Sequence, residues 1–285
     1  MAISGYIIEK YNYMSNAYTC NRLVTEATKL GLDLKIIGIH DTYVSDSRIT
    51  NDGKQLEPRD FVINRYKWGK LKDAVNSLGK RTYNSLEAYS TYINKYEQVR
   101  NLHSDAFLVP KYTLATASHK YDSLCQYLGS PFVAKGLESS QGAEIFLIEK
   151  EQDFTELQNQ FGTEKEWLLE EFISSSIGRD MRFYSIRGKA EACMVRKSQG
   201  DFRANVALGA SVEQFEITPA ISRIAADIYA QTGLDFLGID LLFGEEKPYF
   251  CEINVMPGIE GIEKATGVNI AKRIIQTIKG DFEDD

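Results

Sequence analysis

Three oxygen-bearing side chains near the carboxyl end of the chain have the types and spacing of a metal site. Asp240 lies in the apolar stretch GIDLLF, and Glu252 and Asn254 lie in a second one, YFCEINV. Residues i and i+2 of a strand point to one face, so Glu252 and Asn254 project together, and the short turn between the strands can bring Asp240 onto that face. Carboxylates among apolar residues are costly unless they are paired or bind a cation, and hard oxygen ligands favour Mg²⁺. The alternative is a single edge-strand acid that faces solvent, and the convergence of three ligands favours the metal.

Basic side chains that could bind phosphate precede these acids in the sequence. Mg²⁺ usually fills its shell with phosphate oxygens and water, so a phosphate-binding region is expected beside it. A lysine at a strand end is a point charge for phosphate, and an arginine offers a planar fork for phosphate or carboxylate. The candidates are Lys95, Lys135, Arg196, Arg203 and the neighbouring Asn205. A single lysine or arginine is more often a solvated charge, and Lys95 taken alone fits either interpretation.

A polar loop follows Lys135 and can offer backbone N–H groups to the same phosphates. It lies between two short apolar stretches, residues 131–135 and 144–148, and is therefore predicted to be a hairpin tip that can close over a ligand. Its phosphate-binding candidates are Ser139, Ser140, Gln141 and Gly142.

A segment that ends the next apolar strand could hold the edge of an adenine. It combines an aromatic residue with backbone groups at a strand end, and its residues are Glu170, Glu171, Phe172 and Ile173. Composition alone favours the alternative, an ordinary connector between two lobes.

The elements that must position these residues follow from hydrophobic periodicity and from Gly, Pro and cap signals. Strands and helices alternate over the first part of the chain, which argues for a small parallel sheet flanked by helices. We expect strands at residues 5–11, 32–39 and 60–64, and helices at 16–30, up to 79, and 85–103.

Farther along, the pattern predicts strands that form two hairpins and then a sheet with late helices. Thr218 and Pro219 open one helix that Gly233 ends, and Asn269 caps the last one. The expected strands are residues 131–135, 144–148, 167–173, 181–186, 190–196, 238–243 and 249–255, with another helix at 151–161.

Composition excludes several classes of protein. The 285 residues suffice for two or three lobes. A content of 43% hydrophobic and 26% charged residues is ordinary for a soluble protein. Because neither a membrane span nor a signal sequence is recognisable, we expect the protein in the cytoplasm. A net charge of −7 argues against general nucleic-acid binding. Four scattered cysteines and three histidines argue against a zinc site and indicate buried cysteines, not nucleophiles. The acidic residues 281–285 are expected to form a solvated tail.

Several motifs together resemble a known family. Asp240 with the stretch EINVMPG resembles the D…ExNxxPG signature of ATP-grasp enzymes, and its continuation GIEGIEKATGVNIA resembles the GLEGIEKTTGIDIA ending of RimK-like ligases. KGLESSQG, GDFRAN and YTCNRL resemble that family's KxxEGTQG, GDFRSN and YSCKRL. These motifs span nearly the whole chain, in the same order and with similar spacing.

The resemblance implies a mixed α/β and α+β structure, the ATP-grasp fold, in which two α+β lobes clasp ATP behind a small N-terminal α/β domain. We expect the N-terminal domain at residues 1–90, a central lobe with the phosphate loop at 91–173, and a C-terminal lobe with the metal site at 174–285.

The resemblance also implies roles for the candidate residues. Lys95 and Lys135 would contact the nucleotide, residues 170–173 would be the adenine segment, and Asp180 would lie near the ribose. Arg203 and Asn205 would lie at the γ-phosphate and the acyl phosphate. The metal ligands Asp240, Glu252 and Asn254 would hold two Mg²⁺ ions, for which Mn²⁺ could substitute.

The implied reaction needs no protein nucleophile. A substrate carboxylate attacks the γ-phosphate, and an amine then attacks the acyl phosphate to form an amide, so positioning and electrostatics supply most of the rate. The expected partners are an amino acid, with glutamate favoured, and the carboxylate of a peptide, a protein tail or a small molecule; a homo-oligomer is compatible with the resemblance.

Departures from the family pattern leave the substrate open. VRK stands where the family has ERR, and VALGA follows GDFRAN where the family often has HRGG. Two other functions remain as alternatives: a catalytically silent ATP-binding regulatory protein, and a general α/β binding protein for small anions that needs no metal ligands.

Overall fold

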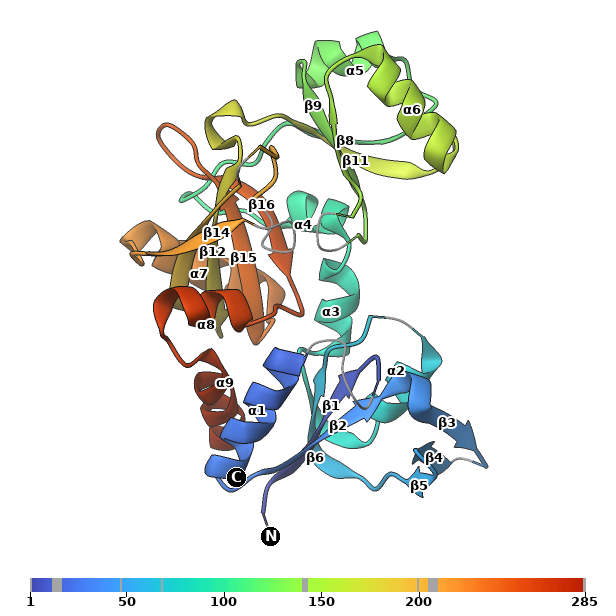
Figure 1. Ribbon diagram of the computed structural model, residues 1–285, viewed down its shortest axis with the longest axis vertical. Coiled ribbons are helices and arrows are strands. Elements are labelled where there is room, and N and C mark those ends of the chain that lie inside the picture. Colours follow the sequence, from blue (N-terminus) through green and yellow to red (C-terminus); the bar gives the residue numbers. More distant parts are fainter. Residues whose placement is uncertain are drawn as a thin grey trace.

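The computed structural model describes residues 2–11, 17–46, 48–67, 69–139, 143–198, 200–204 and 210–283. Within these ranges the chain forms three sheets of four or five strands and a small three-stranded sheet. Figure 1 shows the three larger sheets as successive bodies, from the N-terminal sheet through a C-terminal lobe to a central lobe at the far end. No helix in the described ranges is long and apolar enough to cross a bilayer.

The N-terminal sheet is parallel, with the strand order β2-β1-β6-β7, as the alternation of strands and helices predicts. Its strands are β1 (Ser4–Glu9), β2 (Asp33–Gly38), β6 (Arg59–Asn64) and β7 (Gly79–Tyr83), and its helices are α1 (Ala17–Lys29) and α2 (Lys70–Asn76). The carboxyl ends of β1, β2 and β6 face the remainder of the molecule (Figure 1).

A small antiparallel sheet interrupts this domain in a stretch for which no strand was predicted. A 3₁₀ turn at Ile39–Asp41 leads into β3 (Thr42–Ser45), which pairs with β4 (Arg48–Asn51), and β4 pairs with β5 (Lys54–Gln55). These strands are short and polar, so they lack the apolar alternation by which strands are recognised.

The central lobe is a four-stranded antiparallel sheet with the order β10-β9-β11-β8. Figure 1 shows two helices packed together over one face of it. The elements are β8 (Tyr112–Thr116), α5 (Tyr121–Leu128), β9 (Phe132–Gly136), β10 (Ile145–Ile148), α6 (Glu151–Phe161) and β11 (Glu166–Glu171). The hairpin β9–β10 is confirmed, and it places the polar loop at its tip.

The C-terminal lobe is a five-stranded antiparallel sheet with the order β14-β13-β12-β15-β16. Thr218 and Asn269 cap their helices through side-chain oxygens, as predicted. The elements are the 3₁₀ turn Ser174–Ser176, β12 (Arg179–Ile186), β13 (Lys189–Lys197), β14 (Ser211–Phe215), α7 (Pro219–Thr232), β15 (Phe236–Leu242), β16 (Tyr249–Asn254), α8 (Glu260–Thr266) and α9 (Ile270–Gly280).

The single helix expected at residues 85–103 is wrong, because two helices occupy that stretch. α3 (Leu86–Tyr92) ends before Asn94, whose backbone is extended, and α4 (Lys95–Asn101) begins directly after it. The Asn94 side chain accepts a hydrogen bond from the Tyr96 N–H, 2.9 Å away. Asparagine favours this cap position over a helix interior, so it starts a new helix and brings Lys95 to the first position of α4.

The solvated tail expected at residues 281–285 is wrong for Asp281 and Phe282, and residues 284–285 lie outside the described residues. Asp281 accepts a hydrogen bond from Arg187 at 2.7 Å and lies 3.1 Å from Arg81 of β7. The ring of Phe282 lies 6.1 Å from that of Phe61. Asp281 and Phe282 therefore join the C-terminal lobe to the N-terminal sheet, whereas Glu283 is exposed and forms an ion pair with Lys279 of α9.

Candidate functional site

A cavity between the central and C-terminal sheets gathers most of the predicted site residues. It holds about 80 Å³ of free space, and one wall comes from β9 and β11 and the other from β12, β13, β15 and β16. The predicted residues that line it are Lys135, Glu170, Glu171, Phe172, Ile173, Asp180, Arg196, Arg203, Asp240 and Glu252. The sequence placed these residues in separate motifs, and the fold brings them to one place.

Strand register explains how the acids of the C-terminal lobe meet. Asp240 of β15 is directly opposite Glu252 of β16, and it is also opposite Arg182 of β12. Asp180 is opposite Arg196 in the same way. Directly opposed residues of an antiparallel pair share a face, so these five charged side chains lie on one face of the sheet.

Arginines neutralise the buried acids of this face. Arg182 donates two hydrogen bonds to Asp240, at 2.6 and 2.5 Å, and Arg196 donates to Asp240 at 2.8 Å and to Asp180 at 2.5 Å. Burial raises the pKa of Asp240, but the two guanidinium groups outweigh it and lower the pKa to about 2. For Asp180, burial outweighs Arg196 and raises the pKa to about 6. Asp240 is therefore a carboxylate at neutral pH.

Two of the predicted metal ligands, Asp240 and Glu252, are opposed within β15 and β16, and the third, Asn254, ends β16. Glu252 Oε2 is 3.1 Å from Lys95 Nζ, and although burial raises the pKa of Glu252, Lys95 lowers it overall. The Asn254 Oδ1 accepts from the Met256 N–H at 3.0 Å, and Asn254 is opposite Gly238, outside the cavity lining. Among described residues, no group of three or more His, Cys, Asp or Glu could hold a metal. Two carboxylates with one amide oxygen nevertheless fit Mg²⁺, which needs few protein ligands.

The central lobe contributes the lysine that faces these acids. Lys135 Nζ lies 2.5 Å from Glu170 Oε2 and 3.9 Å from the Cys251 sulfur. Burial lowers the pKa of Lys135, yet its neighbours Cys251 and Glu170 raise it overall, so Lys135 stays a cation. A buried ammonium between the two lobes is suited to phosphate.

The segment of residues 170–173 forms the part of the cavity beyond Lys135. The second carboxylate oxygen of Glu170 is buried and has no hydrogen-bond partner among the described residues. Glu171 accepts from the Lys111 N–H at 3.1 Å, and the ring of Phe172 lies edge-on to Phe202, with 6.3 Å between centroids. A free acceptor beside an aromatic edge is suited to the amino group and ring of a base.

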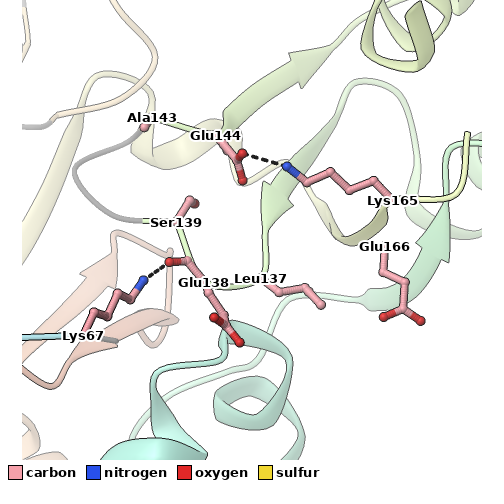
Figure 2. Close-up of a pocket in the computed structure, with 8 residues that line it drawn as sticks. All are labelled: Lys67, Leu137, Glu138, Ser139, Ala143, Glu144, Lys165 and Glu166. Atoms are coloured by element: carbon pink, nitrogen blue, oxygen red, sulfur yellow. Dashed lines mark hydrogen bonds and ion pairs between the residues drawn. The ribbon is translucent and has the colours of Figure 1, made fainter. Parts of the chain in front are cut away.

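The polar loop begins at a second, more open pocket of about 620 Å³, which Figure 2 shows. Lys95 Nζ donates to the Ser139 carbonyl at 2.7 Å, and Lys67 donates to the carbonyl of Glu138. Two lysines from outside the central sheet therefore hold the start of the loop. The predicted residues Ser140, Gln141 and Gly142 lie outside the described residues.

Arg203 reaches the cavity from the segment after β13. It pairs with Asp201 at 2.7 Å and donates to the Ile145 carbonyl of β10 at 3.4 Å, so it touches both lobes. The hydrogen bond from Arg203 lowers the pKa of Asp201. Asn205 lies outside the described residues, as do residues 206–209.

Several cavity residues were not predicted. Arg182 is two residues beyond Asp180 on β12, so the alternation of a strand would have placed it on the same face. Cys251 lies at an irregularity in the β15–β16 register, which turns it toward the cavity beside Glu252. No local pattern predicts that irregularity. Phe202 also lines the cavity, and it could have been found because it lies within the recognised motif GDFRAN.

The comparisons with known proteins show the family and the fold. The chain matches the RimK-like ATP-grasp domain over residues 93–278. It is 31% identical over 276 residues to a protein of Citrobacter koseri named "Probable alpha-L-glutamate ligase", with 92% of each chain covered.

Solved structures share the fold at low sequence identity. The ATP-grasp ligase PsnB complexed with a minimal precursor has a TM-score of 0.75 at 17% identity, covering 98% of this chain and 99% of that one. The D-alanine–D-alanine ligase of Bacillus anthracis complexed with ATP has a TM-score of 0.70 at 15% identity, covering 98% and 97%. With the fold and the family match together, this chain belongs to the RimK-like ATP-grasp family of ligases.

Proposed function

We propose that this protein is an ATP- and Mg²⁺-dependent carboxylate–amine ligase that releases ADP and forms an amide through an acyl phosphate. The observation that carries the proposal is the cavity between the two lobes. It combines a buried lysine, three arginines and the carboxylates of Asp180, Asp240 and Glu252 with the segment 170–173, in which Glu170 carries an unpaired acceptor. A general anion-binding protein would have no need of the acids.

The residues of the cavity divide into a nucleotide side and a reaction side. Glu170 and its neighbours would hold the base, and Lys135 and Lys95 would neutralise phosphates. Asp240, Glu252 and Asn254 would hold Mg²⁺, or Mn²⁺ in its place, which would supply further positive charge to the phosphates.

Arg203 touches both lobes, so it is placed to stabilise the charge that develops on the transferred phosphoryl group. Arg196 fixes Asp180 and Asp240 by hydrogen bonds and so keeps the acidic wall in place. Attack by the substrate carboxylate and then by the amine would need no side-chain nucleophile.

Glutamate is the favoured amino acid, because related proteins carry the name of glutamate ligases. A peptide or protein tail is a suitable acceptor, since PsnB binds a precursor peptide, and a further PsnB structure holds Mg and ADP. A small-molecule carboxylate fits the same chemistry. Residues 206–210, where the chain departs from the family motif, would contribute to this choice.

A silent ATP-binding regulatory protein is the second candidate. One observation favours it: both predicted acidic ligands already have cationic partners, Arg182 and Arg196 on Asp240 and Lys95 on Glu252. Such a protein would bind nucleotide without turnover.

ADP release separates the two candidates. Purified protein with Mg²⁺·ATP is assayed with each of the twenty amino acids, singly and with candidate peptide acceptors. A ligase releases ADP in response to one amino acid, and Glu252→Ala abolishes this release. Glu213→Ala, which removes an exposed acid of the same sheet, keeps it. Nucleotide binding without turnover in any mixture favours the regulatory protein, and a Glu252→Ala variant as active as wild type refutes the metal site.

A further inference from the structure

Near the carboxyl end of the edge strand β16, a side chain and not a neighbouring strand satisfies the backbone hydrogen-bonding groups. β16 pairs with β15 on one side, and no strand of the described part of the chain pairs with it on the other. At its start, the backbone of Leu108 covers the open side, since the Phe250 N–H donates to the Leu108 carbonyl at 2.7 Å. At its end, the Ile253 N–H donates to Gln98 Oε1 at 2.8 Å, and Gln98 Nε2 donates to the Ile253 carbonyl at 3.0 Å.

The Gln98 amide thus makes the pair of hydrogen bonds that a neighbouring strand would make. Gln98 is only 2% exposed, and its amide also donates to the Tyr92 carbonyl at the end of α3, 2.7 Å away. All three hydrogen bonds are buried, so the side chain is held in one orientation.

The position of these bonds matters because Ile253 lies between Glu252 and Asn254. The Ile253 N–H belongs to the peptide unit that joins it to Glu252, and its carbonyl belongs to the unit that joins it to Asn254. Fixing both peptide planes fixes the directions in which the two flanking side chains leave the backbone. The same helix, α4, also places Lys95 beside the Glu252 carboxylate.

We propose that Gln98 is a positioning residue for the metal: its amide holds the backbone at Ile253 so that Glu252 and Asn254 present their oxygens together to a divalent cation. This inference rests on the proposed function, because it takes those two residues as ligands. Gln98 itself does not touch the cation. Groups that orient metal ligands without binding the metal change affinity by about 10- to 100-fold when they are removed.

The test measures binding, not turnover. The affinity of ADP is determined by calorimetry over a series of Mg²⁺ concentrations for wild type, Gln98→Leu and Gln98→Glu. Gln98→Glu keeps the acceptor for the Ile253 N–H but loses the donor, and it serves if the leucine variant does not fold. Both variants should need about 10- to 100-fold more Mg²⁺ for half of its effect, with unchanged ADP affinity in the absence of Mg²⁺.

Asn51→Leu is the matched control, because Asn51 is also a buried amide that donates to a backbone carbonyl, Gly38, at 3.0 Å, but in the small sheet of the N-terminal domain. It should lose stability and keep the wild-type Mg²⁺ dependence. An unchanged Mg²⁺ dependence in the Gln98 variants, when Glu252→Ala has lost it, overturns the role of Gln98 alone. If Glu252→Ala responds to Mg²⁺ as wild type does, the metal site fails and this inference fails with it.

Discussion

The charged side chains around the cavity are organised as opposed pairs. Asp240 is held between Arg182 and Arg196, and Glu252 lies against Lys95. The sequence predicted that Asp240 and Glu252 would meet, because a short turn joins two apolar strands whose alternation fixes the face. It did not predict their cationic partners, since Arg182 and Lys95 come from other elements and only the assembled fold brings them within reach.

Cys251 offers a test of the cavity at the scale of one residue. Burial raises the pKa of its thiol to about 12. The reactive thiolate is therefore scarce at pH 8, and its fraction rises about ten-fold with each further pH unit. Cys125 and Cys251 are both half-buried. Because of its raised pKa, we expect iodoacetamide to modify Cys251 at pH 8 at least about ten-fold more slowly than Cys125.

Peptide mass spectrometry of time points between pH 7 and 10 measures both rates in one sample. Mg²⁺·ATP should slow the modification of Cys251 further, since that residue lines the cavity, and should leave Cys125 unaffected. Equal rates for the two cysteines at pH 8 would show that Cys251 is not enclosed in this way.

At the scale of elements, the long apolar strands and the capped helices could be predicted, and the polar or interrupted ones could not. α7 has a threonine cap, a proline in its first turn and a glycine after its end, so its limits followed from the sequence. The small sheet β3-β4-β5 lacks an apolar pattern, and the break at Asn94 looks like a helix interior until its capping hydrogen bond is seen. Hydrophobic patterns in a sequence indicate which residues are buried. The small sheet and the break at Asn94 are instead determined by hydrogen bonds, which such patterns do not indicate.

The phosphate loop gives a prediction at this scale. Lys67, from the end of the N-terminal sheet, holds the loop through the Glu138 carbonyl (Figure 2). Lys67→Met removes this bond and should raise the KM for ATP about ten-fold, the equivalent of ~1.4 kcal/mol. ADP release at varied ATP measures it. Lys70→Met, which changes a fully exposed lysine three residues away, should leave the KM unchanged. A wild-type KM in the Lys67 variant would mean that the loop is ordered without this contact.

At the scale of the whole molecule, the two ends of the chain are joined. Tyr18 and Arg22 of α1 donate hydrogen bonds to Glu263 of α8 at 2.9 and 3.0 Å, and α1 packs against α9. The motifs that carry these residues were recognised separately, and the order of the motifs predicted the succession of lobes. Their contact was not predictable, because no local pattern encodes a pairing across more than 240 residues.

The ion pairs of Asp281 test this connection. Asp281 contacts Arg187 of the C-terminal lobe and Arg81 and Tyr83 of the N-terminal sheet. Asp281→Ala removes the pair with the half-buried Arg187 and the acceptor of the Tyr83 hydroxyl, although Arg187 keeps Asp235 as a partner. It should lower the free energy of unfolding by about 2 kcal/mol, as measured by urea denaturation. Glu283→Ala, which breaks only an exposed pair with Lys279, should change it by less than about 0.5 kcal/mol. Equal losses in the two variants would contradict the connection.

The packing of α1 against α9 also has a consequence for the folding of the protein during its synthesis on the ribosome. The apolar side of α1, with Leu23 and Ala27, shares one buried cluster with Ile270, Ile274 and Ile278. Because translation proceeds from the N-terminus, α1 is made about 240 residues before the helix that covers it. A growing chain therefore carries an uncovered apolar surface until α9 is made. Chains that stop before residue 270 would keep this surface exposed, which makes them targets for chaperones and proteases.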